Sequence, residues 1–431
     1  AAIARGFGLR GVDLGAGECR EEALPDSLYE QFLSGLGLAA ALLYRRIPAG
    51  ADPLGPDNVL GFVSGMLTGT PSLFTGRWMA VGKSPLTGTW GDANCGGRFS
   101  PAIKQCGYDG IFFSGISEKP VYLFCDGKIA ELRDASAYWG MDATEAELKL
   151  QADARVKKRP CVALIGEAGE RVSLIAGICN EGGRIAARSG VGAVMGCKRL
   201  KAVVLAGSRP IPCADTATVH DLSKELGKKI NKASMPSGFG GMLGFGGVMM
   251  GKLPTTMPVD GSLSTYMFKE WGTPFNTPMS VLSGDGPIKN WGGGPRDAKG
   301  LARVYNPDRL NRLETVKYHC YSCPLGCGGR FDITKNAYGN FPETHKPEYE
   351  TLEAFGPLLC NGDLDSVLYI NELLNRAGMD SISAGNTVAW AIECSEKGIL
   401  TREQTDGLEL SWGNAKAIIE LVKKMIAREG F

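Results

Sequence analysis

Short apolar runs dominate the first half of the chain, and they predict β-strands. The runs are rich in β-branched and aromatic residues and are bounded by Gly, Pro or Asn, a pattern typical of short strands. Asp126-Gly127 is expected to turn a hairpin. The predicted strands are Val59–Val63, Trp78–Val81, Ile111–Phe113, Val121–Cys125, Val162–Ile165, Val172–Ile178 and Val203–Ala206, with helical patches at Leu28–Leu43 and Thr144–Val156.

The pattern changes near Ile211-Pro212, beyond which helical spacing dominates. The stretch Ser234–Gly294 is thick with Gly, Pro and Met and predicts a long loop, and such loops usually carry a function or cover a ligand. The fold class is therefore α+β, with a β-rich domain over residues 1–210 and a mostly helical domain over 211–431. The predicted helices are Thr216–Lys232, a helical region from Asp363 onward, and Ala415–Arg428 between an N-cap at Asn414 and a C-cap at Gly430.

Charge and composition narrow the class of partners. Lys plus Arg is 47 and Asp plus Glu is 46, giving a net charge of +1, so neither nucleic acid nor an anionic membrane is favoured. There is no apolar run long enough for a transmembrane helix, and the first residues lack the apolar core of a secretory signal. The 13 cysteines are thus expected to be reduced thiols or metal ligands in a cytoplasmic protein.

Three cysteines form the strongest chemical motif. Cys320, Cys323 and Cys327 have the spacing C-x2-C-x3-C, and Gly and Pro between them let the backbone wrap around one inorganic group. Soft thiolates suit an iron–sulfur cluster or zinc. Zinc commonly uses two paired C-x2-C knuckles, and the sequence has no second one. The motif therefore predicts an iron–sulfur cluster, whose fourth ligand is Cys360, Cys394 or a residue outside this chain.

Glycines alternate with basic residues in a second set of segments, 75–77, 83–97 and 182–192. Guanidinium groups bind phosphate through two hydrogen bonds, and glycines expose backbone N–H groups to it, so a phosphorylated cofactor is one interpretation. Solvated arginines beside turns are the alternative. The glycine-rich segment 238–247 lacks the lysine of a P-loop and is interpreted as a loop.

Two carboxylates lie two residues apart in Lys346-Pro-Glu348-Tyr-Glu350. Either side chain could act as a general base, and in an extended segment the two would point to opposite sides. A solvated turn is the alternative. The three histidines make no recognisable metal pair and are expected to be structural.

Taken together, these segments resemble the tungsten-dependent aldehyde ferredoxin oxidoreductase family. The resemblance runs through most of the chain and includes the cysteine motif. Its other matching segments are Lys83-Ser-Pro-Leu-Thr-Gly, Ala93-Asn-Cys-Gly-Gly, Gly107-Tyr-Asp-Gly, Glu118-Lys-Pro-Val-Tyr, Leu132-Arg-Asp-Ala-Ser, Ile165-Gly-Glu-Ala-Gly-Glu, Gly190-Val-Gly-Ala-Val-Met-Gly, Pro347-Glu-Tyr-Glu and Gly378-Met-Asp.

The resemblance implies a tungsten or molybdenum bis-pterin centre on a β-rich base, beside a 4Fe-4S cluster. It implies that Glu350 is the active-site glutamate and that Cys320, Cys323 and Cys327 bind the cluster. It assigns the pterin and phosphate contacts to Arg77, Asn94, Gly96, Arg184, Ile185, Ala187 and Arg188, and those to the other pterin to Asn375, Met379 and Asp380.

The implied activity is oxidation of an aldehyde to a carboxylic acid, or the reverse, with electrons passing through the cluster to ferredoxin or to an iron–sulfur or flavin partner subunit. The resemblance also allows a homodimer. Two alternatives stay open: an aromatic acyl-CoA ring-reducing subunit of the same family, and a non-catalytic electron-transfer module. The third domain of the family is expected to be missing from this chain, so that another segment or subunit completes the site. The glycine-rich insertion at 234–251 has no counterpart in the resemblance.

Overall fold

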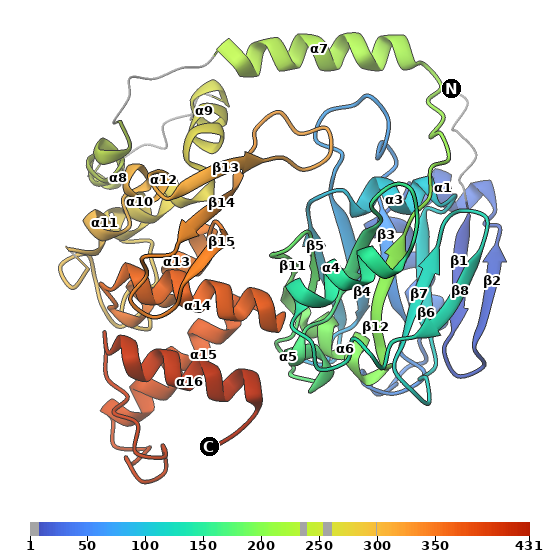
Figure 1. The fold of residues 1–431 in the computed structure, drawn as a ribbon. Helices are drawn as coiled ribbons and strands as arrows, with labels where there is room; N and C mark the ends of the chain where they lie inside the picture. The colour runs from blue at the N-terminus through green and yellow to red at the C-terminus, as the bar shows by residue number, and fades with distance from the viewer. Residues whose placement is uncertain (1–7, 233–238, 253–260, 299) are drawn as a thin grey trace. The chain divides into compact units, whose positions relative to one another are not determined.

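The computed structural model describes residues 8–232, 239–252, 261–298 and 300–431. The chain forms two compact units, a β-rich first unit and a mostly helical second unit, which confirms the α+β class (Figure 1). The domain boundary expected near residue 210 stays a prediction. The first unit comprises Ala1–Glu225, Cys320–Cys323 and Asn375–Asp380, and the second comprises Leu226–His319, Pro324–Leu374 and Ser381–Phe431.

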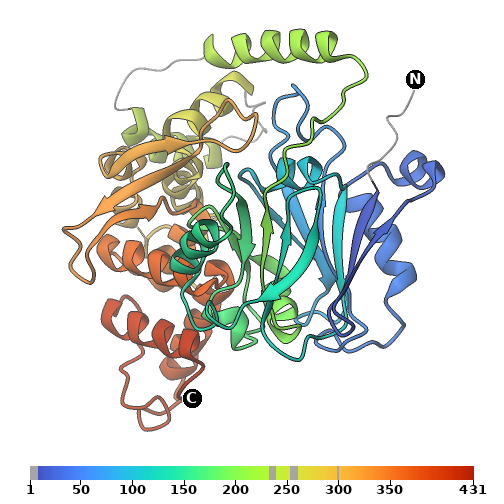
Figure 2. The same ribbon diagram turned by 45° about the vertical axis from the view of Figure 1, so that its right-hand side comes forward.

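Two six-stranded mixed sheets build the first unit; most of their strands are labelled in Figure 1, and Figure 2 gives a second view of the same ribbon. Within each sheet one neighbouring pair is parallel, β1 with β6 and β7 with β12, and the other pairs are antiparallel. The first sheet has the order β2 (Glu18–Glu22), β1 (Leu9–Asp13), β6 (Gly110–Ser114), β3 (Leu60–Ser64), β4 (Trp78–Lys83), β5 (Trp90–Cys95). The second has the order β11 (Arg184–Ala186), β10 (Ile178–Asn180), β9 (Cys161–Leu164), β12 (Leu200–Leu205), β7 (Val121–Cys125), β8 (Ala130–Asp134).

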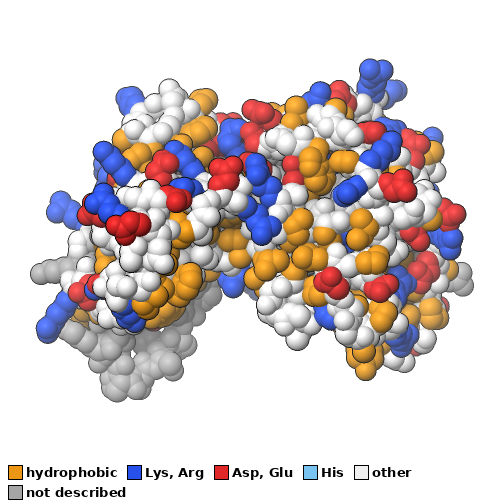
Figure 3. Space-filling view, turned by 90° about the horizontal axis from the view of Figure 1, so that it is seen from below, with side chains coloured by type: hydrophobic (Ala, Val, Ile, Leu, Met, Phe, Trp, Pro, Cys, Tyr) orange, Lys and Arg blue, Asp and Glu red, His pale blue; other side chains and the backbone are white. Residues whose placement is uncertain are grey.

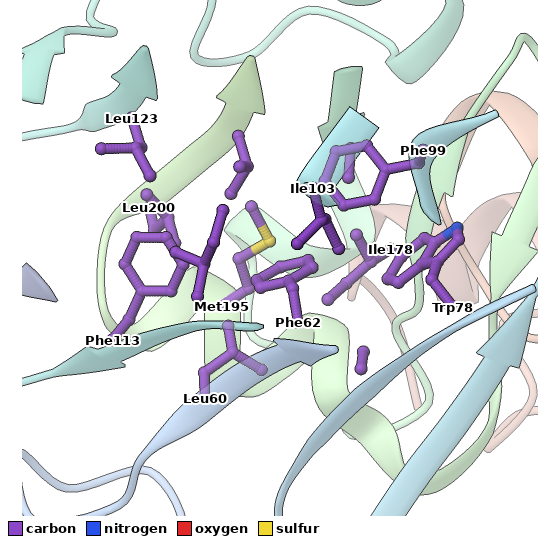
Figure 4. Packing of buried hydrophobic residues seen from close by; sticks show 14 of the residues in the cluster. Leu60, Phe62, Trp78, Phe99, Ile103, Phe113, Leu123, Ile178, Met195 and Leu200 are labelled. Carbon is purple, nitrogen blue, oxygen red and sulfur yellow. The ribbon is translucent and has the colours of Figure 1, made fainter. Parts of the chain in front are cut away.

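The main hydrophobic core joins side chains from both sheets (Figure 4). Phe62 and Trp78 come from the first sheet and stack with ring centroids 5.7 Å apart, while Leu123 and Leu200 come from the second. Two short helices complete this core, α3 (Phe99–Gln105) and α6 (Val191–Cys197). The other helices of the first unit are α1 (Asp26–Phe32), α2 (Leu36–Arg46), α4 (Ala143–Asp153) and α5 (Glu167–Glu170), and α7 (Thr216–Lys232) continues into the second unit.

Strand β7 (Val121–Cys125) is apolar at every position because both of its faces are buried. Leu123 faces the core between the sheets, whereas Tyr122 and Phe124 pack in a second cluster with Ala146 and Leu150 of α4. Because successive strand residues point to opposite faces, a strand that is covered on both faces needs apolar residues at every position. Each such buried side chain contributes about 1.5–3 kcal/mol.

Helices and a small antiparallel sheet build the second unit. Its sheet has the order β13 (Glu314–Tyr318), β14 (Gly328–Ile333), β15 (Phe341–His345). Its α-helices are α8 (Leu243–Lys252), α9 (Gly261–Trp271), α10 (Asn276–Ser283), α11 (Leu301–Val304), α12 (Pro307–Asn311), α13 (Tyr349–Phe355), α14 (Leu364–Ala377, whose last residues belong to the first unit), α15 (Ser381–Glu396) and α16 (Ala415–Ala427), and its 3-10 helices are η2 (Phe239–Met242), η3 (Thr273–Phe275) and η4 (Pro357–Leu359).

The loop predicted over residues 234–294 is wrong for 239–252 and 261–283, which are largely helical, whereas 284–294 contains no helix or strand. Helices α8, α9 and α10 lie in this stretch, while 234–238 and 253–260 fall outside the described residues. Leu243, Met267, Trp271 and Phe275 are buried together there, and this packing outweighs the low helix propensity of the many glycines.

Three local predictions also need correction. The strand predicted at Val172–Ile178 begins only at Ile178, because Val172 has a φ of 55° that ends any extended run. The helix predicted at Leu28–Leu43 breaks in two at Leu33, whose φ is 59°. The final helix has its N-cap at Asn414, as predicted, but its C-cap is Arg428 rather than Gly430.

Acidic and basic side chains are interspersed on the face seen in Figure 3, so this face has no large patch of one charge. None of the helices in the described ranges is long and apolar enough to cross a membrane.

The contact between α5 and α6 gives a stability prediction. A Cβ atom at Gly196 would lie 1.8 Å from the carbonyl oxygen of Gly169, so we expect Gly196→Ala to destabilise the first unit by about 1–3 kcal/mol or more. The matched control is Gly227→Ala in α7, where a Cβ meets nothing within 4 Å and the change should stabilise the helix by up to about 1 kcal/mol. Thermal unfolding followed by circular dichroism measures both, and equal melting temperatures for the two variants would contradict the prediction.

Candidate functional site

The β4–β5 hairpin positions the first two predicted site residues. Asn94 lies opposite Met79 in the register, one residue beyond the pair of Trp78 and Cys95. Arg77 precedes β4, and its Nε donates to the Asn94 side-chain oxygen while a terminal nitrogen lies 3.4 Å from the Asn94 carbonyl oxygen. Arg77 and Asn94 therefore hold each other at the exposed end of this hairpin.

A glycine turn follows β5 and is fixed by the β10–β11 hairpin. The Asn180 side-chain amide donates to the Gly96 carbonyl oxygen at 3.1 Å. The Glu181 carboxylate accepts from the Arg98 backbone N–H at 2.6 Å. Gly97 has a φ of 101°, which favours glycine at this position.

The segment that carries two motif cysteines belongs to the first unit and lies along this turn. The Tyr321 N–H donates to the Gly97 carbonyl oxygen at 3.0 Å, and the Ser322 carbonyl oxygen accepts from the Phe74 N–H at 2.9 Å. The Cys323 N–H donates to the Cys320 carbonyl oxygen at 3.1 Å, so the segment 320–323 forms a tight turn. These backbone bonds place Cys320 beside the turn.

Gly96 is the point where the site residues converge. A Cβ atom built on Gly96 would lie 2.5 Å from the Cys320 Sγ, 2.8 Å from a guanidinium nitrogen of Arg184 and 3.5 Å from one of Arg77. The Arg184 side chain comes from β11 and lies 3.5 Å from the Glu181 carboxylate. The structure thus brings one motif thiol and two predicted phosphate-binding arginines to one backbone position.

A second distant segment, 375–380, joins the first unit beside β10. The Gly177 N–H donates to the Gly378 carbonyl oxygen at 2.8 Å, and Met379 forms an isolated β-bridge with Ala176. The Asn375 carbonyl oxygen lies 3.7 Å from the Cys179 Sγ. The side-chain nitrogen of Asn375 is buried and has no hydrogen-bond partner.

Asp380 and Arg188 form the remaining polar pair of this region. Asp380 is buried, with its carboxylate 3.4 Å from Arg188 Nε, while Arg188 is exposed. Ile185 packs instead against the apolar cluster on α4, and Ala187 lies beside Gly177. Arg188 is therefore held by a carboxylate, and Ile185 and Ala187 offer backbone groups rather than charge to a ligand.

Cys327 belongs to the second unit, whereas Cys320 and Cys323 belong to the first. In the described ranges, no three His, Cys, Asp or Glu residues gather as a site for a single metal ion. A four-iron cluster does not need such a site, because each of its cysteines binds a different iron. The assignment of Cys320, Cys323 and Cys327 to a cluster therefore stays a prediction. Cys360 lies beside Lys289 and Asp297.

Glu350 lines a cavity of about 780 Å³ that lies within the second unit. Helix α13 begins at Tyr349, so the condition of an extended segment, under which Glu348 and Glu350 would point to opposite sides, is not met. Glu348 is the N-cap residue, is exposed, and accepts a hydrogen bond from the Thr273 hydroxyl. Burial raises the pKa of Glu350, and the neighbouring Glu348 adds to this shift. Glu350 makes no ion pair with any residue that the structure describes.

Glu353 is a residue of this cavity that the sequence reasoning missed. It is 4% exposed, and neither of its carboxylate oxygens makes a hydrogen bond. Its pKa is raised to about 8, chiefly by burial and also by the negative charges of Asp285 and Glu350, while the nearby Ser280 hydroxyl opposes the shift. An acidic residue one helical turn after Glu350, inside the apolar run Leu352–Phe355, is the signal that could have found it.

Comparisons with known proteins agree on one family. Residues 9–207 match the model of "Aldehyde ferredoxin oxidoreductase, N-terminal domain", and residues 258–431 match "Aldehyde ferredoxin oxidoreductase, domains 2 & 3". The chain is 34% identical over 429 residues to the tungsten-containing aldehyde ferredoxin oxidoreductase of Pyrococcus furiosus, which covers 97% of the chain and 64% of that relative. It is also 34% identical to the enzyme of the same name from Thermococcus kodakarensis, over 97% of the chain and 63% of the relative.

Two further similar proteins have names that indicate reactions other than aldehyde oxidation. The chain is 30% identical to an aliphatic sulfonate oxidoreductase, WOR-like subunit, of Pyrococcus furiosus, over 97% of the chain and 64% of that protein. It is similar to a chain of the active-site complex BamBC of benzoyl coenzyme A reductase with 1,5-dienoyl-CoA, with a TM-score of 0.80, 28% identity, and coverage of 99% of this chain and 61% of that one. The chain thus spans less than two thirds of the length of these relatives.

The buried carboxyl of Glu353 predicts a pH-dependent stability. Its folded-state pKa of about 8 exceeds the ordinary 4.5, so the folded state binds the proton more tightly than the unfolded state between these values. The contribution of Glu353 to the free energy of unfolding therefore falls as pH rises from 4.5 to 8, by about 1.4 kcal/mol per pH unit.

We expect Glu353→Gln to remove this fall and to be more stable than the parent chain at pH 8. Urea unfolding at several pH values measures the effect. Glu420→Gln, a change on α16 at an exposed residue, is the control and should keep the parent's slope. Parallel pH profiles for the parent and Glu353→Gln would contradict the prediction.

Proposed function

Because this chain belongs to the aldehyde ferredoxin oxidoreductase family, we propose that it is an oxidoreductase that converts an aldehyde and water into a carboxylic acid, or catalyses the reverse reaction. The observation that carries the proposal is the convergence of the Cys320 thiol with Arg77 and Arg184 at Gly96. A thiol for an iron–sulfur cluster and cations for a phosphorylated pterin then lie at one turn. Electron transfer from one group to the other needs such a short separation.

The residues present fit the implied cofactor. Arginine side chains pair with phosphate, the exposed turn offers backbone N–H groups, and the unpartnered Asn375 amide is a buried donor that a pterin could satisfy. When bound, the tungsten (or molybdenum) bis-pterin group supplies the two-electron redox chemistry. The residues proposed to hold it are Arg77, Asn94, Gly96, Arg184, Ile185, Ala187 and Arg188 for one pterin and its phosphate, and Asn375, Met379 and Asp380 for the other.

Cys320, Cys323 and Cys327 are proposed to bind a 4Fe-4S cluster, with a fourth ligand from Cys360 or from another segment or subunit. If bound by these cysteines, a cluster would supply one-electron transfer toward ferredoxin or toward an iron–sulfur or flavin partner subunit. The names of the relatives support ferredoxin as the partner class. A cytoplasmic location and a homodimer are compatible with this proposal.

Glu350 is proposed as the proton acceptor. Oxidation of an aldehyde with water requires that a proton leaves the attacking oxygen, and a carboxylate within reach can take it. Burial raises the pKa of Glu350 toward neutral pH, and a general base works best when its pKa lies near the working pH. Glu348 is exposed and its carboxylate accepts a hydrogen bond from the Thr273 hydroxyl, so it is not proposed as the proton acceptor.

A second function has one observation in its favour. The similarity to the benzoyl coenzyme A reductase complex, over 99% of this chain, supports reduction of an aromatic acyl-CoA ring as the alternative. Thioester-dependent oxidation of a reduced dye, in place of aldehyde-dependent dye reduction, would distinguish it. A non-catalytic electron-transfer module would contain iron without tungsten or molybdenum.

Elemental analysis of matched variants tests the cofactor assignment. We expect Arg184→Ala to lower tungsten and pterin content together while iron is retained, because Arg184 is assigned to the phosphate and not to the cluster. Cys323→Ser should instead remove iron and the paramagnetic signal of the reduced cluster. Unchanged tungsten in the first variant, or unchanged iron in the second, would refute the corresponding assignment.

Kinetics of two neighbouring variants test the proton acceptor. Glu350→Gln is expected to cut the rate of aldehyde oxidation by roughly a hundred- to ten-thousand-fold, the usual contribution of a general base, with metal and pterin content unchanged. Glu348→Gln, two residues away and exposed, is the control and should alter the rate far less. A fully loaded Glu350→Gln protein with the parent's rate would remove this residue from the mechanism.

A further inference from the structure

The cavity of the second unit is acidic, and its described lining residues supply no counter-charge. Asp285, Glu350 and Glu353 line it, from the loop after α10 and from α13. No lysine, arginine or histidine is among its described lining residues. The charged groups that face Glu353 are thus all negative, while the contributions of α10 and α15 to the lining are uncharged.

Glu353 marks the place where a ligand is needed. Its side chain lines the cavity and is nine-tenths buried, and the nearby Ser280 hydroxyl makes no well-formed hydrogen bond to either of its oxygens. A buried carboxylate without a partner is unfavourable by several kcal/mol, and a donor that enters the cavity would relieve this. The carboxylate accepts hydrogen bonds when ionised, so a cationic donor is the strongest partner.

The walls of the cavity also favour a cation on an organic body. Trp291 and Tyr349 both line it, and aromatic faces attract ammonium and guanidinium groups. Met279 and Leu358 supply apolar surface for a carbon chain. The cavity volume of about 780 Å³ is that of a small-molecule site.

We propose that this cavity selects substrates with a cationic nitrogen, which binds Glu353 while the reacting carbonyl lies at Glu350. This inference rests on the proposed function, in which Glu350 belongs to the substrate site. The two glutamates are one helical turn apart, with Cβ atoms about 5–6 Å from each other, so the substrate class is a short aldehyde or acid with an ammonium group at its far end. Asp285, at the exposed side of the cavity, attracts the same charge during entry.

Proton release is a separate signature of this binding mode. Glu353 holds its proton up to a pKa of about 8, because burial and the negative charges of Glu350 and Asp285 disfavour its ionised form. A bound cation favours the ionised form, so uptake of the ligand near neutral pH should release a proton. Calorimetry in buffers with different ionisation enthalpies detects this release.

Three probes with the same carbon chain test the charge preference on the native protein: butylamine as the cation, butan-1-ol as the neutral molecule and butyrate as the anion. We expect butylamine to bind about tenfold or more tightly than butan-1-ol, as one charge-assisted hydrogen bond allows, and butyrate to bind most weakly. Tryptophan fluorescence follows binding, because Trp291 lines the cavity. Equal affinities for the amine and the alcohol would overturn the proposal.

Two variants locate the effect. Glu353→Gln should remove the preference for butylamine and its proton release while the affinity for butan-1-ol stays. Asp285→Asn, at an exposed residue whose replacement leaves the buried packing intact, should weaken the preference in part. The control Glu420→Gln, outside the cavity, should keep it. An undiminished preference in both cavity variants would contradict the assignment.

Competition separates this inference from the proposed function. N,N-Dimethylbutylamine, a protonated tertiary amine that cannot condense with an aldehyde, should raise the KM for an aldehyde without a change in kcat. Aldehyde oxidation that this amine does not inhibit would overturn the proposed cavity specificity but leave the oxidoreductase intact. Charge-selective binding in a fully loaded protein that oxidises no aldehyde would refute the proposed function and leave the ligand preference of the cavity standing.

Discussion

The missing side chain at Gly96 is the constraint on which the rest of the first site depends. Any Cβ there would collide with the Cys320 sulfur and an Arg184 nitrogen, so only glycine lets the thiol segment and the β11 arginine approach the same turn. The backbone bond from Tyr321 to Gly97 holds this approach, and the Asn180 amide fixes the carbonyl of Gly96. Cys320 differs from the other twelve cysteines in its place beside Gly96 and the two arginines.

The two candidate sites have opposite electrostatics, which a net charge of +1 conceals. In the first unit, Arg77 and Arg184 lie beside a thiol at an open turn, a setting that suits a bound phosphate. In the second unit, carboxylates line a partly open cavity without a cation among the described lining residues. Anionic cofactors and cationic organic molecules would therefore be sorted between the two units by charge alone.

The sequence predicted elements where one local rule decides the conformation, and it failed where packing decides. Strand β7 was predicted to the residue, because an apolar run buried on both faces is unambiguous, and Asn414 caps α16 as its side chain requires. Helices α8 to α10 were missed, because glycine-rich segments fold only through contacts that involve residues such as Trp271. The cysteine and arginine motifs predicted the residues that meet at Gly96, whereas Glu353 acquires its properties only from burial, which no local pattern states.

The first unit is assembled from three pieces of the chain, and two of them, 320–323 and 375–380, lie more than ninety residues beyond Glu225. Its sheets form early in synthesis, but the β-bridge of Ala176 with Met379 waits until the ribosome has passed that methionine. The nascent protein therefore exposes the edge beside β10 through much of its translation, and contacts of such long sequence separation form slowly. A cut between the two halves would leave the first unit without the backbone of 320–323 and 375–380, so this unit is a product of the whole chain rather than a module that can be transplanted by its N-terminal sequence.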